Sequence, residues 1–148
     1  MTDGGYPPVD DFLTHASDVG GEASASDIAQ AEAELGVALP ATLRAFLSRA
    51  GWAAMEANEY FGIGAGVPEY IHLVRITLAE RHELEPGLPT HLIPLRGDGA
   101  GNLYALDLDR GSPDDPSVVF WEHDGNGVPL QVSERYTDWL KAETADRK

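Results

Sequence analysis

The sequence predicts a single α+β domain: a mainly antiparallel sheet with helices packed on one side, a pair of helices near the N-terminus and a helix at the C-terminus. Its 148 residues suit one domain. Apolar residues recur at helical spacing before residue 51 and again near the end of the chain, whereas short apolar runs separated by turns fill residues 92–121. Strands joined by short turns pair antiparallel, and the separation of helices from strands is typical of the α+β class.

Three segments are expected along the chain. Residues 1–23 are expected to be loosely structured, because Pro7-Pro8 disfavours a helix there. Residues 24–141 are expected to form the domain. The polar tail, residues 142–148, is expected to fray.

Two helices are predicted at the start of the domain. The first lies between Ser24, which suits an N-cap, and Gly36, which suits the left-handed position after a helix. The second begins at Pro40 and is expected to end at Gly51. Apolar side chains recur every three or four residues in both, namely Ile28, Ala31 and Leu35 in the first and Leu39, Leu43, Phe46, Leu47 and Ala50 in the second.

The middle of the chain is less regular. Residues 60–63 predict a short strand that runs into a Gly-rich turn. Residues 70–81 place several apolar side chains on one helical face, although their β-branched members would also suit a strand. We favour a helix, because Ala79-Glu80-Arg81 continues without a turn signal.

The C-terminal part predicts strands and a closing helix. Residues 92–95, 103–108 and 118–121 are apolar runs bounded by turn residues, and Leu130 and Val132 suggest one more short strand. Pro94 places the first of these strands at an edge or a strand end. The closing helix is predicted from apolar residues at helical spacing, which are Val132, Tyr136, Trp139 and Leu140.

Charge excludes two classes of partner. The chain has 25 Asp and Glu against 10 Lys and Arg, a formal net charge of −15. Nucleic acids and anionic membranes both require clustered basic residues on the protein, so we expect neither. A charged partner is therefore expected to be a basic protein.

The cysteine count and the N-terminus indicate compartment. The chain has no Cys, which excludes disulfides, thiolate metal sites and a Cys nucleophile. Its first residues lack the basic start and apolar run of a signal peptide, and no stretch approaches the ~18 consecutive apolar residues of a membrane span. We expect a cytoplasmic protein.

Motifs of catalysis are missing from the sequence. It contains no H-E-x-x-H, G-x-S-x-G or Walker motif. Carboxylates gather between residues 98 and 115, but a calcium loop that starts at Asp107 would need Glu where Val118 stands. We expect no metal and no cofactor. A metal-dependent hydrolase using Asp107, Glu122 or His123 is the enzymatic alternative.

The densest charge lies between residues 98 and 124, where seven acids accompany one base, Arg110. Most of these acids fall in predicted turns, and we expect them to ring one end of the sheet. They form either a solvated rim that keeps the protein soluble or a docking face for a basic protein. For the docking face, the candidate residues are Asp98, Asp109, Asp114, Asp115, Glu122 and Asp124.

Several stretches, in this order, resemble one known family. They are Ile28 with Glu32-Ala33-Glu34-Leu35-Gly36, Leu39-Pro40 with Leu43-Arg44 and Phe46-Leu47, Asp98-Gly99-Ala100-Gly101-Asn102 followed by Leu106-Asp107-Leu108, Trp121-Glu122-His123-Asp124, and Tyr136 with Trp139. Their order and spacing resemble the SUKH superfamily of Smi/Knr-type proteins over about residues 24–140. The chain departs from the family at Ala50, where Asn is frequent, at Asn102, where an acid is frequent, and over residues 52–69.

The resemblance implies an α+β domain without enzymatic activity. Bacterial members of the superfamily are regarded as immunity proteins that bind and neutralise a cognate toxin, frequently a nuclease. The fungal namesakes regulate cell-wall synthesis and contact other cellular proteins. The leading hypothesis is thus an immunity protein against a basic toxin, and the alternative is a regulatory or scaffold module of the Smi/Knr type.

Overall fold

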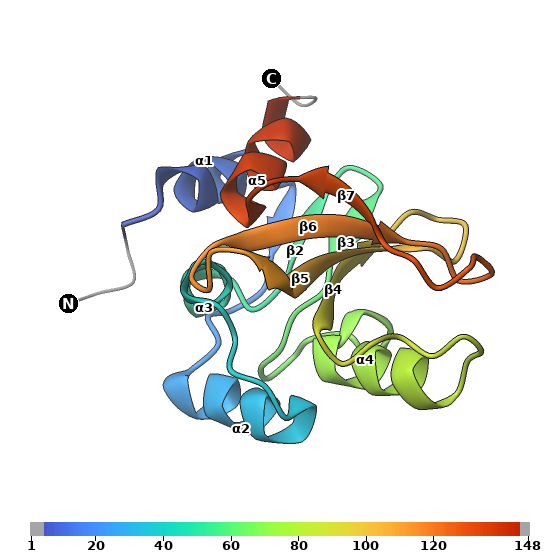
Figure 1. The fold of residues 1–148 in the computed structure, drawn as a ribbon. Coiled ribbons are helices and arrows are strands. Elements are labelled where there is room, and N and C mark those ends of the chain that lie inside the picture. Colours follow the sequence, from blue (N-terminus) through green and yellow to red (C-terminus); the bar gives the residue numbers. More distant parts are fainter. Residues whose placement is uncertain (1–4, 146–148) are drawn as a thin grey trace.

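Seven strands form one antiparallel sheet in which chain order is also spatial order, in a computed structural model that describes residues 5–145 (Figure 1). The strands are β1 (Asp18–Val19), β2 (Ala53–Met55), β3 (Asn58–Tyr60), β4 (Leu92–Gly97), β5 (Leu103–Gly111), β6 (Pro116–Trp121) and β7 (Leu130–Ser133). The helices are α1 (Pro7–His15), α2 (Ala25–Leu35), α3 (Ala41–Arg49), α4 (Leu73–His82) and α5 (Tyr136–Ala145), with a 3₁₀ turn at Glu69–Ile71. The predicted single-domain α+β class is confirmed.

Helices lie on both sides of the sheet, so the expectation that all of them pack on one side is wrong. Figure 1 shows α1 and α5 on one side and α4 on the other. The reason is that neighbouring residues of the inner strands point to opposite faces, and both are buried. These pairs are Leu92 and Ile93 in β4, Ala105 and Leu106 in β5, and Val118 and Val119 in β6. A sheet that is apolar on both faces needs cover on both.

The N-terminal segment is part of the fold, which corrects the expectation of a loose lead-in. Pro7 and Pro8 occupy the first turn of α1, where their missing N–H groups cost no helical hydrogen bond. Phe12 of this helix is fully buried, and its ring lies 5.6 Å from that of Phe46 and 4.8 Å from that of Tyr60. Strand β1 then pairs with β2. The prolines therefore start a helix here rather than block one.

The predicted helix pair is confirmed, and local signals set its ends. Ser24 and Asp27 form a capping box at the start of α2: the Ser24 N–H donates to the Asp27 Oδ2 at 2.9 Å, and the Asp27 N–H donates to the Ser24 Oγ at 3.0 Å. Gly36 ends this helix in the left-handed conformation, with φ of 77°. Helix α3 follows Pro40 and ends at Arg49, slightly before the predicted glycine.

The middle of the chain holds a hairpin that the sequence pattern missed. Strands β2 and β3 pair through a tight turn in which Glu56 takes a positive φ. Positive φ is uncommon for residues other than glycine, so the sequence contains no turn signal at this position. The helix predicted over residues 70–81 is confirmed as the 3₁₀ turn and α4. Pro94 does not mark an edge, because β4 lies between β3 and β5, with an irregularity in register just after the proline.

A buried ion pair holds the C-terminal helix on the sheet. The Arg96 Nε on β4 donates to the Glu143 Oε1 on α5 at 2.7 Å, and the Tyr60 hydroxyl donates to the same oxygen at 2.5 Å. The Arg96 and Glu143 side chains are only 10% and 13% exposed. Burial lowers the pKa of Arg96, but the hydrogen bonds and charge of Glu143 outweigh this and hold that pKa above its ordinary value. Burial and Glu143 together raise the pKa of Tyr60.

This pair corrects the expectation of a frayed tail over residues 142–148. Residues 142–145 form the last turn of α5, and Glu143 is anchored within it. Residues 146–148 lie outside the described part of the chain.

We predict that Glu143→Ala lowers the free energy of unfolding by about 3 kcal/mol, because Arg96 is then buried without its carboxylate. Glu34→Ala, which truncates an exposed helical glutamate on α2, is the matched control. Urea unfolding of both variants measures the difference, and equal stabilities would contradict the role given to this ion pair.

Candidate functional site

The candidate docking carboxylates lie at both ends of the sheet, so the expectation that they ring one end is wrong. Successive turns of an antiparallel meander fall at opposite ends of the strands. The β4–β5 and β6–β7 turns, residues 98–102 and 122–129, form what we call the turn end, which carries Asp98, Glu122 and Asp124. The hairpin end, residues 107–116, carries Asp109, Asp114 and Asp115 together with Asp107.

At the hairpin end, Asp115 works inside the fold. Its two carboxylate oxygens accept hydrogen bonds from the backbone N–H of Thr137 at 3.1 Å and from its hydroxyl at 2.6 Å. Asp115, from the β5–β6 hairpin, thus supplies an acceptor for a backbone N–H group in the first turn of α5 that has no partner within the helix. Its neighbour Asp114 has an exposed side chain and binds Thr42 only through its backbone carbonyl.

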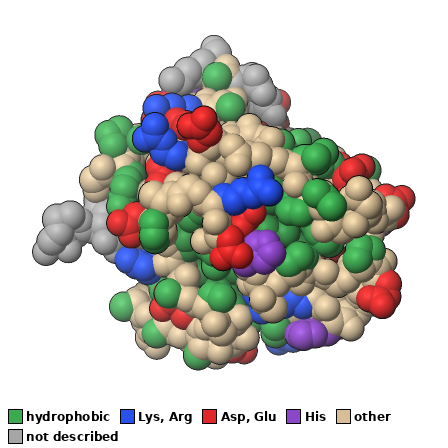
Figure 2. Space-filling model, in the orientation of Figure 1, with side chains coloured by type: hydrophobic (Ala, Val, Ile, Leu, Met, Phe, Trp, Pro, Cys, Tyr) green, Lys and Arg blue, Asp and Glu red, His purple; other side chains and the backbone are tan. Residues whose placement is uncertain are grey.

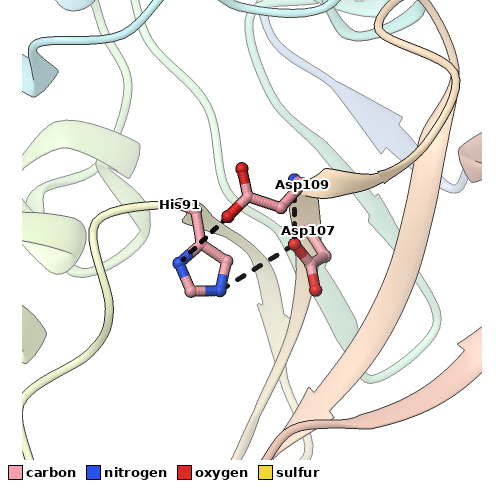
Figure 3. Close-up of side chains that lie close together, drawn as sticks. All are labelled: His91, Asp107 and Asp109. Atoms are coloured by element: carbon pink, nitrogen blue, oxygen red, sulfur yellow. Dashed lines mark hydrogen bonds and ion pairs between the residues drawn. The ribbon is translucent and has the colours of Figure 1, made fainter.

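A His–Asp–Asp cluster also lies at the hairpin end (Figure 3). The ring of His91 is directed at two carboxylates of β5: its Nε2 is 3.9 Å from the Asp107 Oδ1 and its Nδ1 is 3.8 Å from the Asp109 Oδ2. Asp107 is buried, and its Oδ1 accepts the backbone N–H of Asp109 at 3.0 Å. These three side chains are close enough together for one metal ion.

The geometry favours contacts within the chain over a metal centre. Each ring nitrogen of His91 faces a different carboxylate, whereas a metal ion takes one nitrogen of an imidazole. The guanidinium of Arg110 lies 3.2 Å from the second oxygen of Asp107 and already supplies a positive charge. No spacing within a single element predicts this cluster, because His91 comes beside β5 only when Leu92 of β4 pairs with Asp107 of β5.

At the turn end, Asp98 organises its own loop. Its Oδ1 accepts the backbone N–H groups of Ala100 at 2.8 Å and Asn102 at 3.0 Å, and its Oδ2 accepts the Asn102 side chain at 2.9 Å. Burial raises the pKa of Asp98, but these hydrogen bonds outweigh it and hold the pKa below its ordinary value.

The same loop orients His123. The amide oxygen of Asn102 accepts the backbone N–H of His123 at 3.1 Å and lies 2.9 Å from its ring Nδ1. A carboxylate, an amide and an imidazole thus form a chain from Asp98 to His123. The hydrolase residues are not gathered into one site, since Asp107 is at the hairpin end while Glu122 and His123 are at the turn end.

Like Asp114 at the hairpin end, Glu122 and Asp124 are exposed and have no Lys or Arg partner among the described residues. Neither lies within 4.0 Å of a Lys or Arg nitrogen in the part of the chain that the structure describes. Figure 2 shows acidic side chains along the right margin of the molecule, the end where Figure 1 places the β6–β7 turn, with no basic side chain beside them in that view. The turn end therefore presents uncompensated negative charge to solvent.

We predict that Asp115→Ala lowers the free energy of unfolding by about 1–2 kcal/mol, because the first turn of α5 loses two hydrogen bonds. Asp114→Ala, the adjacent exposed carboxylate, should change stability by no more than about 0.5 kcal/mol. Thermal unfolding distinguishes the two, and an equal response would show that Asp115 does not cap α5.

Acid titration tests the role of Asp98. Because its pKa is lower in the folded than in the unfolded chain, its contribution to stability is present above the ordinary value of 3.8 and is lost as pH falls through the lowered pKa. The variant Asp98→Ala should lose stability at neutral pH and show a shallower decline in unfolding free energy below pH 3.8 than the parent. Parallel declines in the two proteins would contradict this assignment.

Comparison with known proteins identifies the family of the chain. Among residues 5–145, no helix combines the length and hydropathy that a bilayer crossing requires. A search of curated proteins gives no match. The family model SUKH_6, described as SMI1-KNR4 cell-wall, matches residues 25–140, which is more than half of the chain and agrees with the resemblance seen in the sequence. The chain therefore belongs to the SUKH family of SMI1-KNR4 proteins.

Proposed function

We propose that the protein is a non-enzymatic binding module: a cytoplasmic immunity protein that binds and neutralises a basic toxin. Family membership supports a protein-binding module of the immunity or Smi/Knr type. The observation that carries the proposal is the turn end, where Glu122 and Asp124 are exposed without a cation partner. Carboxylates in that state keep their full charge available for another molecule.

Electrostatics explains why a basic toxin fits. A nuclease carries clustered positive charge where it grips phosphates, and a surface of carboxylates can cover that charge. The net charge of −15 adds long-range attraction that accelerates the encounter with a basic protein. Exposed ion pairs between the two proteins, at the rim of their interface, would set the orientation in which they bind. The hairpin end contributes less, because Asp107 already faces Arg110 and Asp115 already accepts hydrogen bonds from Thr137, which leaves only Asp109 and Asp114 of its described carboxylates exposed.

One observation favours the alternative function. The description of the matched family refers to the cell wall. This description supports a regulatory or scaffold module that contacts other cellular proteins. Both candidates use a protein-binding surface, so the identity of the partner separates them.

Co-expression with the product of the adjacent gene tests the proposal. If that gene encodes a toxin, we expect cells to survive only when this protein is present, and the two chains to purify as a complex. Survival without this protein, or a toxin that stays free during purification, would contradict the immunity role and favour the Smi/Knr-type alternative.

Charge removal at the turn end supplies a kinetic prediction. The double variant Glu122→Gln/Asp124→Asn should slow association with that toxin by roughly threefold to tenfold at low salt, with unchanged thermal stability. The matched control, Asp109→Asn/Asp114→Asn, removes the same charge from the hairpin end and should slow association less. Surface plasmon resonance at two salt concentrations measures both. Equal slowing by the two variants, or association rates that do not change with salt concentration, would show that the turn end does not steer the partner.

A further inference from the structure

We propose that β7 is a docking edge, to which a basic partner adds an extended segment of its own chain as a further strand of the sheet. The inference rests on the proposed function, because it takes the partner to be a basic protein. It specifies how that partner is held: by main-chain pairing along β7, beside the carboxylates of the turn end.

The outer edge of β7 is open. β7 is the last strand of the sheet and pairs only with β6 among the described residues, so its outer N–H and C=O groups face away from the sheet. Residues 130–133 include no Lys, Arg or Pro, residues with which proteins protect such an edge, while Pro129 stands directly before the strand and the pairing of the strand with β6 is irregular opposite Val118 and Val119. The opposite edge, β1, is only two residues long. β7 is therefore the better template for an added strand.

Apolar side chains are exposed along the same edge. The exposed fractions are 60% for Val128, 55% for Leu130 and 46% for Val132, at alternate positions leading into and along β7. Leu130 pairs across the sheet with Phe120, which pairs with Tyr104, so these side chains lie in one row on one face. An apolar side chain of an added strand would extend that row by contact with Leu130. Of the three, Leu130 has a register partner on β6, Val132 falls at an irregularity in that pairing and Val128 precedes the strand, so the exposed apolar surface centres on Leu130.

Negative charge beside β7 favours a basic partner. The β6–β7 turn brings Glu122 and Asp124 to the start of this edge, and Glu134 follows its end. The nearby Arg135 is already paired with Asp138 at 3.5 Å. A second copy of this chain would carry the same acids and the same net charge of −15, so repulsion opposes pairing of two β7 strands. A segment that alternates basic and apolar residues satisfies the open backbone, the apolar row and the carboxylates together.

An NMR titration tests the inference directly. The probe is an acetylated and amidated hexapeptide, Lys-Val-Lys-Val-Lys-Val, added to the full ¹⁵N-labelled chain. We expect amide shifts concentrated in residues 128–133, next to the open edge. Two control peptides isolate the causes: the same peptide methylated at every backbone nitrogen cannot pair with a strand, and the Glu-Val counterpart has the wrong charge. Neither should shift these amides.

Matched variants of the protein complete the test. Val132→Lys places a positive charge on the edge and should weaken binding of the Lys-Val peptide about tenfold or more, whereas Val19→Lys, which alters an equally exposed valine (46%) on β1, should leave it unchanged. Absence of binding to the parent protein, equal binding of the methylated peptide, or shifts centred on β1 or the hairpin end would overturn the inference.

The two proposals fail separately. A toxin complex that forms while the peptide gives none of the expected shifts would remove the docking edge and leave the immunity role. The expected peptide shifts without any toxin complex would retain β7 as a docking edge and contradict the immunity role.

Discussion

The buried pair of Arg96 and Glu143 is the constraint on which the arrangement of the sheet and the last helix depends. Burying a guanidinium costs desolvation free energy, which must be offset by a paired carboxylate and by contacts with further polar or aromatic groups. Here Glu143 provides the carboxylate, and the rings of Tyr104, Trp139 and Tyr60 lie 4.4, 5.8 and 5.9 Å from the guanidinium carbon. The pair ties α5 to the central strand β4, so that β7, directly before α5, is held at the edge of the sheet.

From this constraint follows the difference between the two ends of the sheet. The hairpin end meets the start of α5 and the loop before β4, and two of its acids are used there: Asp115 caps the helix, while Asp107 faces Arg110 and His91. At the turn end, Glu122 and Asp124 have no such internal partner in the described residues. Negative charge is thus plentiful throughout the protein, but it is available to a partner mainly where the fold leaves it uncompensated.

Local patterns predicted much of the fold. The capping residues Ser24 and Asp27, Gly36 and the apolar spacing of α2 and α3 act within a few residues, so the sequence alone was enough to place these helices. The prediction failed for Pro7-Pro8 because proline both blocks a helix interior and suits a helix start, and only the burial of Phe12 decides between the two.

The site was less predictable, because it depends on which turns share an end of the sheet. Asp98 and Asp124 are distant in sequence but belong to the same end, whereas Asp98 and Asp109 are close in sequence and lie at opposite ends. The cluster at His91 needed the pairing of β4 with β5, which no spacing within one element could reveal. The open apolar edge at β7 was visible only as two residues, Leu130 and Val132, until the strand order placed them last in the sheet.

Hydrogen exchange of the complex with the product of the adjacent gene, compared with the free protein, shows which surface the partner covers. We expect slowed exchange on binding to be confined to residues 98–102 and 122–133, the turn end and the edge strand beside it. Slowed exchange centred instead on residues 107–116, with the turn end unchanged, would contradict this expectation.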